Sequence, residues 1–119
     1  MKKVIAVDFD GTLCTKNWPG IGEPNSELIS QLAEEQKNGA AIILFTCREG
    51  KRLKEAVAWC KDLGLKFDEV NRNLRERIKA YRSDSRKISA DVYIDDRAAA
   101  FEFGKELKLG GKENADENE

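Results

Sequence analysis

The sequence predicts an α/β protein with a doubly wound, Rossmann-like and mostly parallel sheet. Three observations indicate this class: continuous apolar runs that end at polar residues, helical patterns between these runs, and a length of 119 residues, which suits a single domain. An apolar run without alternation is typical of a strand buried on both faces, as in a parallel sheet. Right-handed crossovers between such strands place the residues that follow them at one edge of the sheet.

Four segments are expected to form strands, and apolar residues predominate in the first, second and fourth. In chain order they are residues 4–7, 40–45, 66–70 and 90–94. The third is expected to be short, whereas the fourth is rich in residues that favour strands. The first, second and fourth end directly before the polar residues Asp8, Thr46 and Asp95. These three residues are therefore expected at the carboxyl edge of the sheet.

Apolar residues at helical spacing predict the segments between the first strands. The first helix begins at Asn25 or Ser26, either of which can cap it, and it ends at Gly39. The second helix carries its apolar residues over residues 53–63 and ends at Gly64, where a left-handed residue is expected. Two helices therefore connect the first three strands.

Two further helices are expected towards the carboxyl end of the chain. A strongly basic segment predicts a third helix from about residue 73 to residue 81. A fourth helix is expected after Arg97, with Phe101 and Leu107 facing inward. The alternation of strands and helices thus continues to the end of the predicted domain.

Composition narrows the chemistry that this protein can perform. The chain has 21 basic and 22 acidic residues and no histidine, which excludes serine-histidine and cysteine-histidine nucleophiles and the common zinc ligand sets. The three cysteines, without a Cys-x-x-Cys pair, indicate free thiols in a reducing compartment, so a cytoplasmic protein is expected. The apolar runs are too short for a signal peptide or a membrane span, so no membrane partner is expected. Residues 1–109 are expected to form the domain, and residues 110–119, which are polar and acidic, a disordered tail.

Two pairs of carboxylates follow the predicted strands. Asp8 and Asp10 stand two residues apart where the first strand ends, and Gly11 permits a sharp turn there. Alone this pair is equally typical of a loop that binds nothing. With Asp95 and Asp96 after the last strand, however, the fold would gather four acids, and like charges about 4 Å apart cost about 4 kcal/mol at an effective dielectric of about 20. A cation is therefore expected, and oxygen ligands without histidine favour Mg²⁺.

Thr46 and Lys87 are candidates to bind a phosphoryl group. Thr46 offers a hydroxyl beside backbone N–H groups at a strand end, and Lys87 supplies a positive charge before the last strand. Each alone is more often structural or solvated, but the order Asp-x-Asp, Thr, Lys, Asp-Asp indicates a site. Cys47 and Arg48 follow Thr46 and are, like Thr46, candidates for substrate binding. Arg48 is expected either to bind a second phosphate or to face solvent. The thiols of Cys14 and Cys47 are expected to pack, because nearby negative charge makes a thiol unreactive.

In four motifs the sequence resembles the haloacid dehalogenase-like superfamily of phosphotransferases. The matching residues, in order, are residues 8–13 (Asp-Phe-Asp-Gly-Thr-Leu), residues 44–46 (Leu-Phe-Thr), Lys87, and residues 93–96 (Tyr-Ile-Asp-Asp). The first motif is highly specific, whereas the second and third carry weight through their order. The stretch from residue 87 to residue 97 is also similar to the 5′(3′)-deoxyribonucleotidases, which favours nucleotide chemistry.

The resemblance points to the capless subgroup of this superfamily, which has an open active site. Caps are inserted after the first motif or between the second and third motifs. Residues 11–24 can make only a short hairpin or flap, and residues 47–86 are consumed by a helix, a short strand and another helix. Neither gap therefore has room for a cap domain.

The resemblance implies a Mg²⁺-dependent phosphatase, a phosphoric monoester hydrolase. Asp8 would attack phosphorus to form an aspartyl-phosphate, and Asp10 would protonate the leaving oxygen and then activate water. Mg²⁺ would be held by Asp8, the backbone carbonyl of Asp10, and Asp95, with Asp96 bound directly or in the next shell. The charge on the transferring group would be stabilised by two residues, Thr46 and Lys87.

The expected substrate is a phosphorylated small molecule or a nucleic-acid phosphate. Residues 71–90 contain seven basic and two acidic side chains, which are either a solvated helix face or a surface that recruits such phosphates to the open site. In the second case Arg75, Arg77 and Arg82 would raise kcat/KM for oligonucleotide phosphates. Neither the natural substrate nor the oligomeric state follows from the sequence.

Two other classes of protein share some of these features. A phosphorylation-switch receiver domain also uses aspartates, a threonine and a lysine around Mg²⁺, but its acceptor aspartate lies in mid-chain, whereas the second acidic pair here comes after Lys87. The other alternative is a non-catalytic module that holds phosphate or a partner without turnover. An assay of phosphatase activity with and without Mg²⁺ discriminates such a module from a phosphatase.

Overall fold

The structure, a computed structural model, describes residues 2–98, 101–107 and 109. In chain order its elements are β1 (Val4–Val7), α1 (Ser26–Lys37), β2 (Ala41–Leu44), α2 (Gly50–Asp62), β3 (Glu69–Val70), α3 (Arg75–Tyr81) and β4 (Val92–Ile94). The strands form one sheet in the order β3-β2-β1-β4, and every neighbouring pair is parallel. The predicted α/β class with a doubly wound sheet is confirmed.

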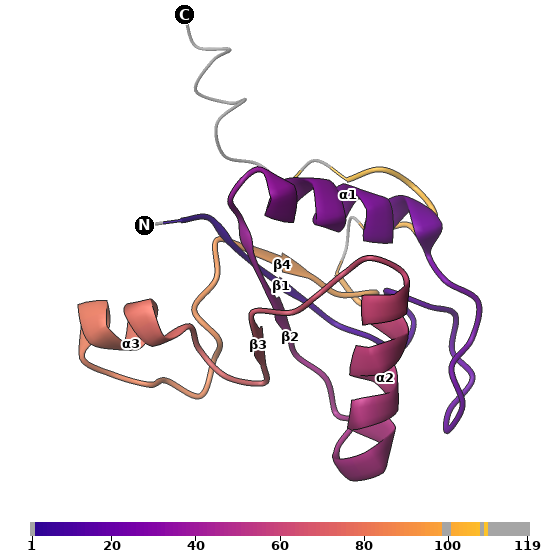
Figure 1. Cartoon of the computed structure of the whole chain (residues 1–119), viewed down its shortest axis with the longest axis horizontal. Coiled ribbons are helices and arrows are strands. Elements are labelled where there is room, and N and C mark those ends of the chain that lie inside the picture. The colour runs from indigo at the N-terminus through magenta and orange to yellow at the C-terminus, as the bar shows by residue number, and fades with distance from the viewer. Residues whose placement is uncertain (1, 99–100, 108, 110–119) are drawn as a thin grey trace, which may run out of the picture.

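The main core lies between one face of the sheet and the helices α1 and α2 (Figure 1). Its fully buried members from these elements are Ile5, Val7, Ile42, Leu44, Leu28, Leu32, Ala56 and Cys60. Successive strand residues point to opposite faces, so the remaining residues of β1 and β2 are buried on the other side. This burial on two faces explains why both strands are continuous apolar runs.

The second face of the sheet has a thinner cover. Its small core contains Val4, Ala6, Ala41 and Ile43 from the strands and Leu74 from the cap of α3, with Phe45, Ile88 and Ala90 packed against it. The helix α3 has only seven residues and lies apart from α1 and α2 (Figure 1). Part of this face is therefore covered by loops only.

The strand order places a topological switch point between β1 and β4. From β1 the chain proceeds through α1 to β2 and through α2 to β3. It then returns across the second face, and β4 pairs with the free side of β1. In open α/β sheets, ligands bind at the carboxyl ends of strands at such a point. The residues directly after β1 and β4 are Asp8 and Asp95.

The predicted helix boundaries agree with the local geometry. Asn25 caps α1, because its side chain accepts a hydrogen bond from the N–H of Leu28 at 3.3 Å. Gly39 follows the end of α1 with φ +105°, and Gly64 follows the end of α2 with φ +95°. These left-handed conformations are easily adopted by glycine.

The segment after the first strand forms a short hairpin-like flap, as expected. We define the flap as residues 15–24. Its ends are joined by two hydrogen bonds, from the N–H of Thr15 to the carbonyl of Glu23 at 2.9 Å and from the N–H of Glu23 to the hydroxyl of Thr15 at 2.8 Å.

The prediction of a fourth helix after Arg97 is wrong for the described residues. Residues 101–107 form turns and irregular backbone, and Gly104 has φ +80°, which interrupts a helix. Phe101 and Leu107 nevertheless pack against the main core, as expected. The side chain of Gln31 in α1 holds the Leu107 backbone through two hydrogen bonds of 2.6 and 3.1 Å. The predicted tail, residues 110–119, lies outside the described residues.

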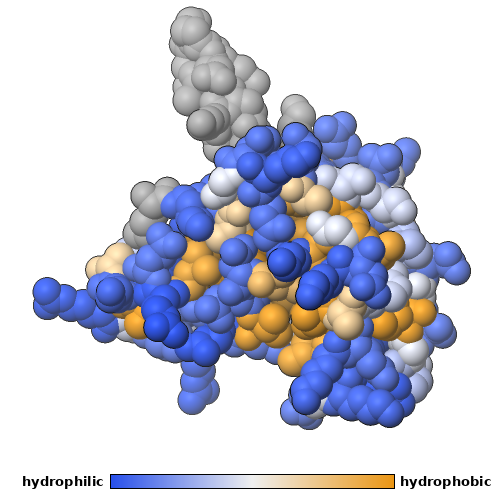
Figure 2. Space-filling model, viewed as in Figure 1, coloured by the Kyte–Doolittle hydropathy of each residue, from blue (hydrophilic) through white to orange (hydrophobic). Residues whose placement is uncertain are grey.

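The surface combines hydrophilic elements with an exposed hydrophobic region. Figure 2 shows hydrophobic residues gathered in the middle of one face, with hydrophilic residues over α3 and over α2 on either side. Within the described part of the chain, no helix has the length and apolar character needed to cross a membrane.

Candidate active site

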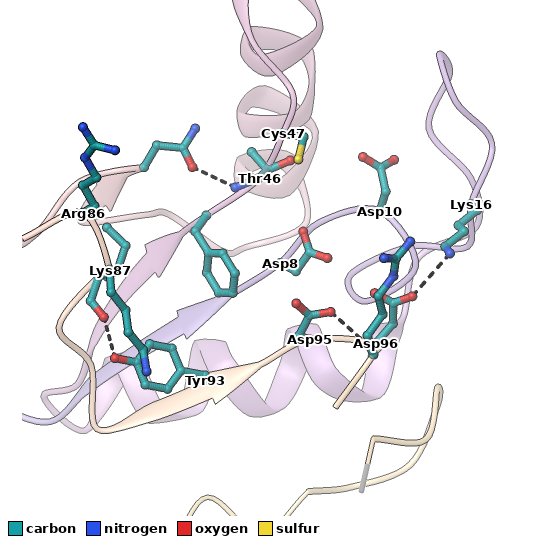
Figure 3. Close-up of a pocket in the computed structure, with 14 residues that line it drawn as sticks. Asp8, Asp10, Lys16, Thr46, Cys47, Arg86, Lys87, Tyr93, Asp95 and Asp96 are labelled. Atoms are coloured by element: carbon teal, nitrogen blue, oxygen red, sulfur yellow. Dashed lines mark hydrogen bonds and ion pairs between the residues drawn. The ribbon is translucent and has the colours of Figure 1, made fainter. Parts of the chain in front are cut away.

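Three carboxylates meet at the switch point of the sheet. Asp8 follows β1, Asp95 and Asp96 follow β4, and each offers an oxygen that lies within 4.8 Å of the other two (Figure 3). The parallel pairing of β1 with β4 therefore brings together three of the four acids that the sequence assigns to this edge. The carboxylate of Asp10 is not part of this group.

Hydrogen bonds from the surrounding backbone orient the three acids. The N–H of the residue after Asp8 donates to its Oδ1 at 2.7 Å, and the N–H two residues after Asp95 donates to its Oδ1 at 3.0 Å. The buried hydroxyl of Thr12 accepts the N–H of Asp96 at 2.8 Å. Gly11 has φ +85°, and a Cβ at this position would lie 2.7 Å from Oδ2 of Asp96. Glycine is therefore required for the close approach of the two loops.

Burial and nearby negative charge both disfavour ionisation of Asp8. Burial is the larger cause, and together with the charges of Asp95, Asp96 and Asp10 it raises the pKa of Asp8 to about 6, against a lowering by the hydrogen bond from the Phe9 N–H. Carboxylates brought this close favour a cation between them. Three oxygen donors without histidine or cysteine suit a hard divalent ion, so the residues of this site fit Mg²⁺.

Asp10 is instead paired with Arg48. Both carboxylate oxygens of Asp10 are engaged, since Nη2 of Arg48 donates to Oδ1 at 2.8 Å and Nε donates to Oδ2 at 2.9 Å. The side chain of Arg48 is 1% exposed, and that of Asp10 is 28% exposed. The hydrogen bond to Asp10 raises the pKa of the Arg48 guanidinium. The expectation that Arg48 faces solvent is therefore wrong, whereas its contact with a second phosphate stays a prediction.

Arg48 also joins the flap to the body of the protein. Its guanidinium donates to the carbonyls of Pro19 at 3.3 Å and Gly20 at 2.7 Å. It lies over the rings of Phe9 and Trp18, at 5.0 and 4.9 Å from their centres. The four hydrogen bonds of Arg48 engage all three nitrogens of its guanidinium, which has five N–H donors.

A pocket of about 660 Å³ opens beside the acids. Thr46 and Cys47 line it, and the hydroxyl of Thr46 accepts the N–H of Arg48 at 3.1 Å. The N–H of Thr46 donates to Oδ1 of Asn71 at 2.7 Å, so this N–H is not free for a phosphate. The hydroxyl proton of Thr46 remains a possible donor. Cys47 is exposed, and the expectation that its side chain packs is therefore wrong, whereas Cys14 is buried as expected.

Lys87 lines the side of the pocket that lies opposite the acids. Its Nζ lies 5.0 Å from the centre of the Tyr93 ring and forms no ion pair with a described acid. Arg86 lies beside it, and Figure 3 shows both with Tyr93 on the same side of the pocket. Arg86 and Lys87 thus lie in a different half of the site from the three acids.

The basic segment, residues 71–90, does not act as one surface. Arg86 and Lys87 line the pocket, whereas Arg77 is buried and pairs with Asp91 at 2.8 Å. The expectation that Arg77 is available to recruit a substrate is therefore wrong. Asn73 is buried too, and its side chain holds the loop before β4 by accepting the N–H of Ser89 at 2.6 Å.

Lys16 and Tyr93 are among the residues at the site that sequence reasoning did not assign to it. Lys16, in the flap, lines the pocket and forms an ion pair of 3.5 Å with Asp96. Tyr93, the residue before the last apolar position of β4, also lines the pocket. The alternation of side chains along a strand would have placed Tyr93 on the second face, but nothing in the sequence shows that this face is thinly covered.

Comparisons with known proteins support the fold. A scan of protein-family models and a search of curated proteins found no match. Among solved structures, the chain is similar to a conserved protein coded by a locus of Bacteroides thetaiotaomicron, with 38% sequence identity and a TM-score of 0.72. The match covers 83% of this chain and 79% of that one. This chain belongs to the same family. The two proteins share the α/β architecture.

Proposed function

We propose that this protein is a Mg²⁺-dependent phosphohydrolase that cleaves a phosphomonoester through an aspartyl-phosphate. The observation that carries the proposal is the convergence of Asp8, Asp95 and Asp96 at the switch point of the sheet, on the wall of a pocket that also holds Thr46 and Lys87. The order of these residues along the chain is that of the haloacid dehalogenase-like motifs. Geometry and motif order support the same chemistry.

Asp8 acts as the nucleophile in this proposal. Its carboxylate oxygen attacks phosphorus, a P–O bond to Asp8 forms, and the P–O bond to the alcohol breaks. The leaving oxygen takes a proton from Asp10, and water then attacks the aspartyl-phosphate while Asp10 takes back a proton. Inorganic phosphate leaves and Asp8 is regenerated. For these steps Asp10 exchanges one of its hydrogen bonds with Arg48 for the leaving oxygen or the water.

The remaining residues position the phosphoryl group. Asp8, Asp95 and Asp96 would hold Mg²⁺, and the backbone carbonyl of Asp10 is a further oxygen donor. When bound, the ion would neutralise the acids and polarise a phosphoryl oxygen. The hydroxyl of Thr46 donates to a second phosphoryl oxygen. Lys87 reaches the phosphoryl group by leaving the Tyr93 ring, a contact that a long flexible side chain readily exchanges.

A second function, phosphate binding without turnover, is favoured by one specific observation. Both oxygens of Asp10, the proposed acid and base, are engaged by Arg48 and lie outside the acidic group. A site in which Asp10 never leaves Arg48 binds Mg²⁺ and phosphate but does not hydrolyse an ester. Both functions therefore predict that the site binds Mg²⁺ and phosphate, but only the first predicts hydrolysis of a phosphate ester.

A phosphatase assay with matched variants tests the proposal. We expect hydrolysis of an aryl phosphate by the wild type in Mg²⁺, loss of it in chelator, and loss of it in Asp8→Asn. The matched control is Asp62→Asn, an exposed aspartate at the end of α2, which should retain activity. Acid quenching during turnover should leave a phosphorylated chain that mass spectrometry assigns to Asp8. Full activity in Asp8→Asn, or turnover that is indifferent to chelator, would refute the mechanism.

A further inference from the structure

Apart from Lys87, the half of the pocket away from the acids has no role in the mechanism above. Three apolar or aromatic side chains line it, namely Phe45, Ile88 and Tyr93. In Figure 3, Tyr93 lies with Arg86 on the side of the pocket opposite Asp95 and Asp96. A substrate whose phosphoryl group sits at Asp8 therefore extends its alcohol part over this half.

The apolar part of this half is a fixed wall. Phe45 and Ile88 pack against the small core of the second face, so their positions are set by the sheet. The Tyr93 hydroxyl donates to the backbone carbonyl of Ile88, and the side chain is still 42% exposed. The Nζ of Lys87 lies over this ring, 5.0 Å from its centre, so the ring face becomes available to a ligand when Lys87 moves to the phosphoryl group. Flat unsaturated rings pack on such faces more favourably than their area alone predicts.

The rim of the same half offers hydrogen-bond donors. The Oδ1 of Asn71 accepts the N–H of Thr46, which leaves its Nδ2 directed elsewhere as a donor. Arg86 is exposed, and it forms no ion pair or hydrogen bond with another residue in the described part of the chain. A guanidinium has donors only and pairs best with a carboxylate or phosphate. The rim therefore suits an anionic group.

We infer that the alcohol part of the substrate is a flat unsaturated ring that carries an anionic group. The ring lies against Phe45 and Tyr93, and the anionic group is bound by Arg86 and by the Asn71 amide. This inference rests on the proposed phosphatase function, because the reactive end of the pocket fixes where the phosphoryl group lies. The thin cover of the second face is what exposes this wall beside the reactive residues.

Three phosphates of primary alcohols test the inference, since their leaving groups have similar chemistry. They are cyclohexylmethyl phosphate, benzyl phosphate and 4-carboxybenzyl phosphate. In Mg²⁺ we expect kcat/KM to rise about fivefold from the cyclohexyl to the benzyl compound, as for one aromatic contact. We expect a further rise of about tenfold with the carboxylate, as for one charge-assisted hydrogen bond.

Two variants assign the preferences to residues. Tyr93→Leu should remove the preference for benzyl over cyclohexylmethyl phosphate, and Tyr93→Phe should keep it. Arg86→Gln should remove the preference for the carboxylated compound, with little change for benzyl phosphate. The matched control is Arg75→Gln, since Arg75 is exposed in the same basic segment and does not line the pocket.

The outcomes separate this inference from the proposed function. Equal kcat/KM for the three phosphates overturns the inference and leaves the phosphatase function intact. Equal effects of Arg86→Gln and Arg75→Gln overturn the assignment of the anionic group to Arg86. If none of the three phosphates is hydrolysed, the proposed function fails, and calorimetry with 4-carboxybenzylphosphonate then tests whether the subsite binds such a ring. If the wild type binds this compound and Arg86→Gln binds it more weakly, the subsite is supported. If the wild type does not bind it, the inference is overturned.

Discussion

Replacing Arg48 by alanine tests the contact that most clearly departs from the sequence-based expectation. The change removes two hydrogen bonds to Asp10, two to carbonyls of the flap, and the stacking between two aromatic rings. It leaves the Asp10 carboxylate without its partner. We expect loss of stability together with release of the flap.

The structure sets the magnitude of this effect. Removing one partner of a buried ion pair costs about 3–5 kcal/mol, because the remaining charge is buried and unpaired. The side chain of Asp10 is 28% exposed, so water can solvate its carboxylate, and we expect about 2–3 kcal/mol here. For a domain of this size, at about 4 °C per kcal/mol, Tm should fall by about 8–12 °C. Arg48→Lys keeps the positive charge but not the bidentate hydrogen bonding, so its Tm should lie between those of the wild type and Arg48→Ala.

Thermal unfolding and limited proteolysis measure the two effects. Arg52→Ala is the matched control, because Arg52 pairs with Glu55 while both side chains are at least 40% exposed, and such surface pairs contribute less than about 1 kcal/mol. Trypsin can cut the flap after Lys16, whose side chain is 62% exposed. In Arg48→Ala the rate of this cleavage should rise, and in Arg52→Ala it should not.

Two results would refute the reasoning. If Arg48→Ala and Arg52→Ala unfold at the same temperature, the buried pair contributes nothing beyond a surface pair. If Tm falls but the cleavage after Lys16 is unchanged, Arg48 stabilises the core and does not hold the flap.

Three further predictions concern the acids. Mg²⁺ at one hundred times its dissociation constant should raise the stability of the native state by about 2.7 kcal/mol, and indifference of thermal unfolding to millimolar Mg²⁺ would contradict a metal site. The stabilisation by Mg²⁺ should be largest above pH 6 and should shrink as the pH falls below 6, because a pKa of about 6 at Asp8 lets protons compete with the ion. The metal-free protein should instead become more stable over the same fall in pH, since the folded state binds the Asp8 proton more tightly than the unfolded chain does. A Mg²⁺-induced shift in Tm that stays constant from pH 7.5 to pH 5 would contradict that assignment. Gly11→Ala should destabilise the protein by about 2 kcal/mol, because φ is +85° and the new Cβ meets Asp96, and it should weaken Mg²⁺ binding in the same titration.

The sequence determined the fold class and the chain positions of the acids. Residues 4–7 and 41–44 are buried on both faces, and such burial requires continuous apolar runs that can be read directly. The parallel arrangement then follows from the helices between the strands, and it places Asp8 and Asp95 at the same edge. The fourth helix failed as a prediction because apolar spacing after Arg97 also fits an irregular segment that packs on the core.

Only the tertiary structure decided how the loops at that edge contact one another. The pairing of Arg48 with Asp10, 38 residues apart, depends on how the flap and the segment before α2 come together, and no local pattern specifies this. The same holds for the bond between Asn71 and Thr46 and for the ion pair of Lys16 with Asp96. Strands are specified by the burial of their own side chains, whereas these polar contacts form between segments that the sheet brings together. Their partners are therefore determined by the packing of the whole chain.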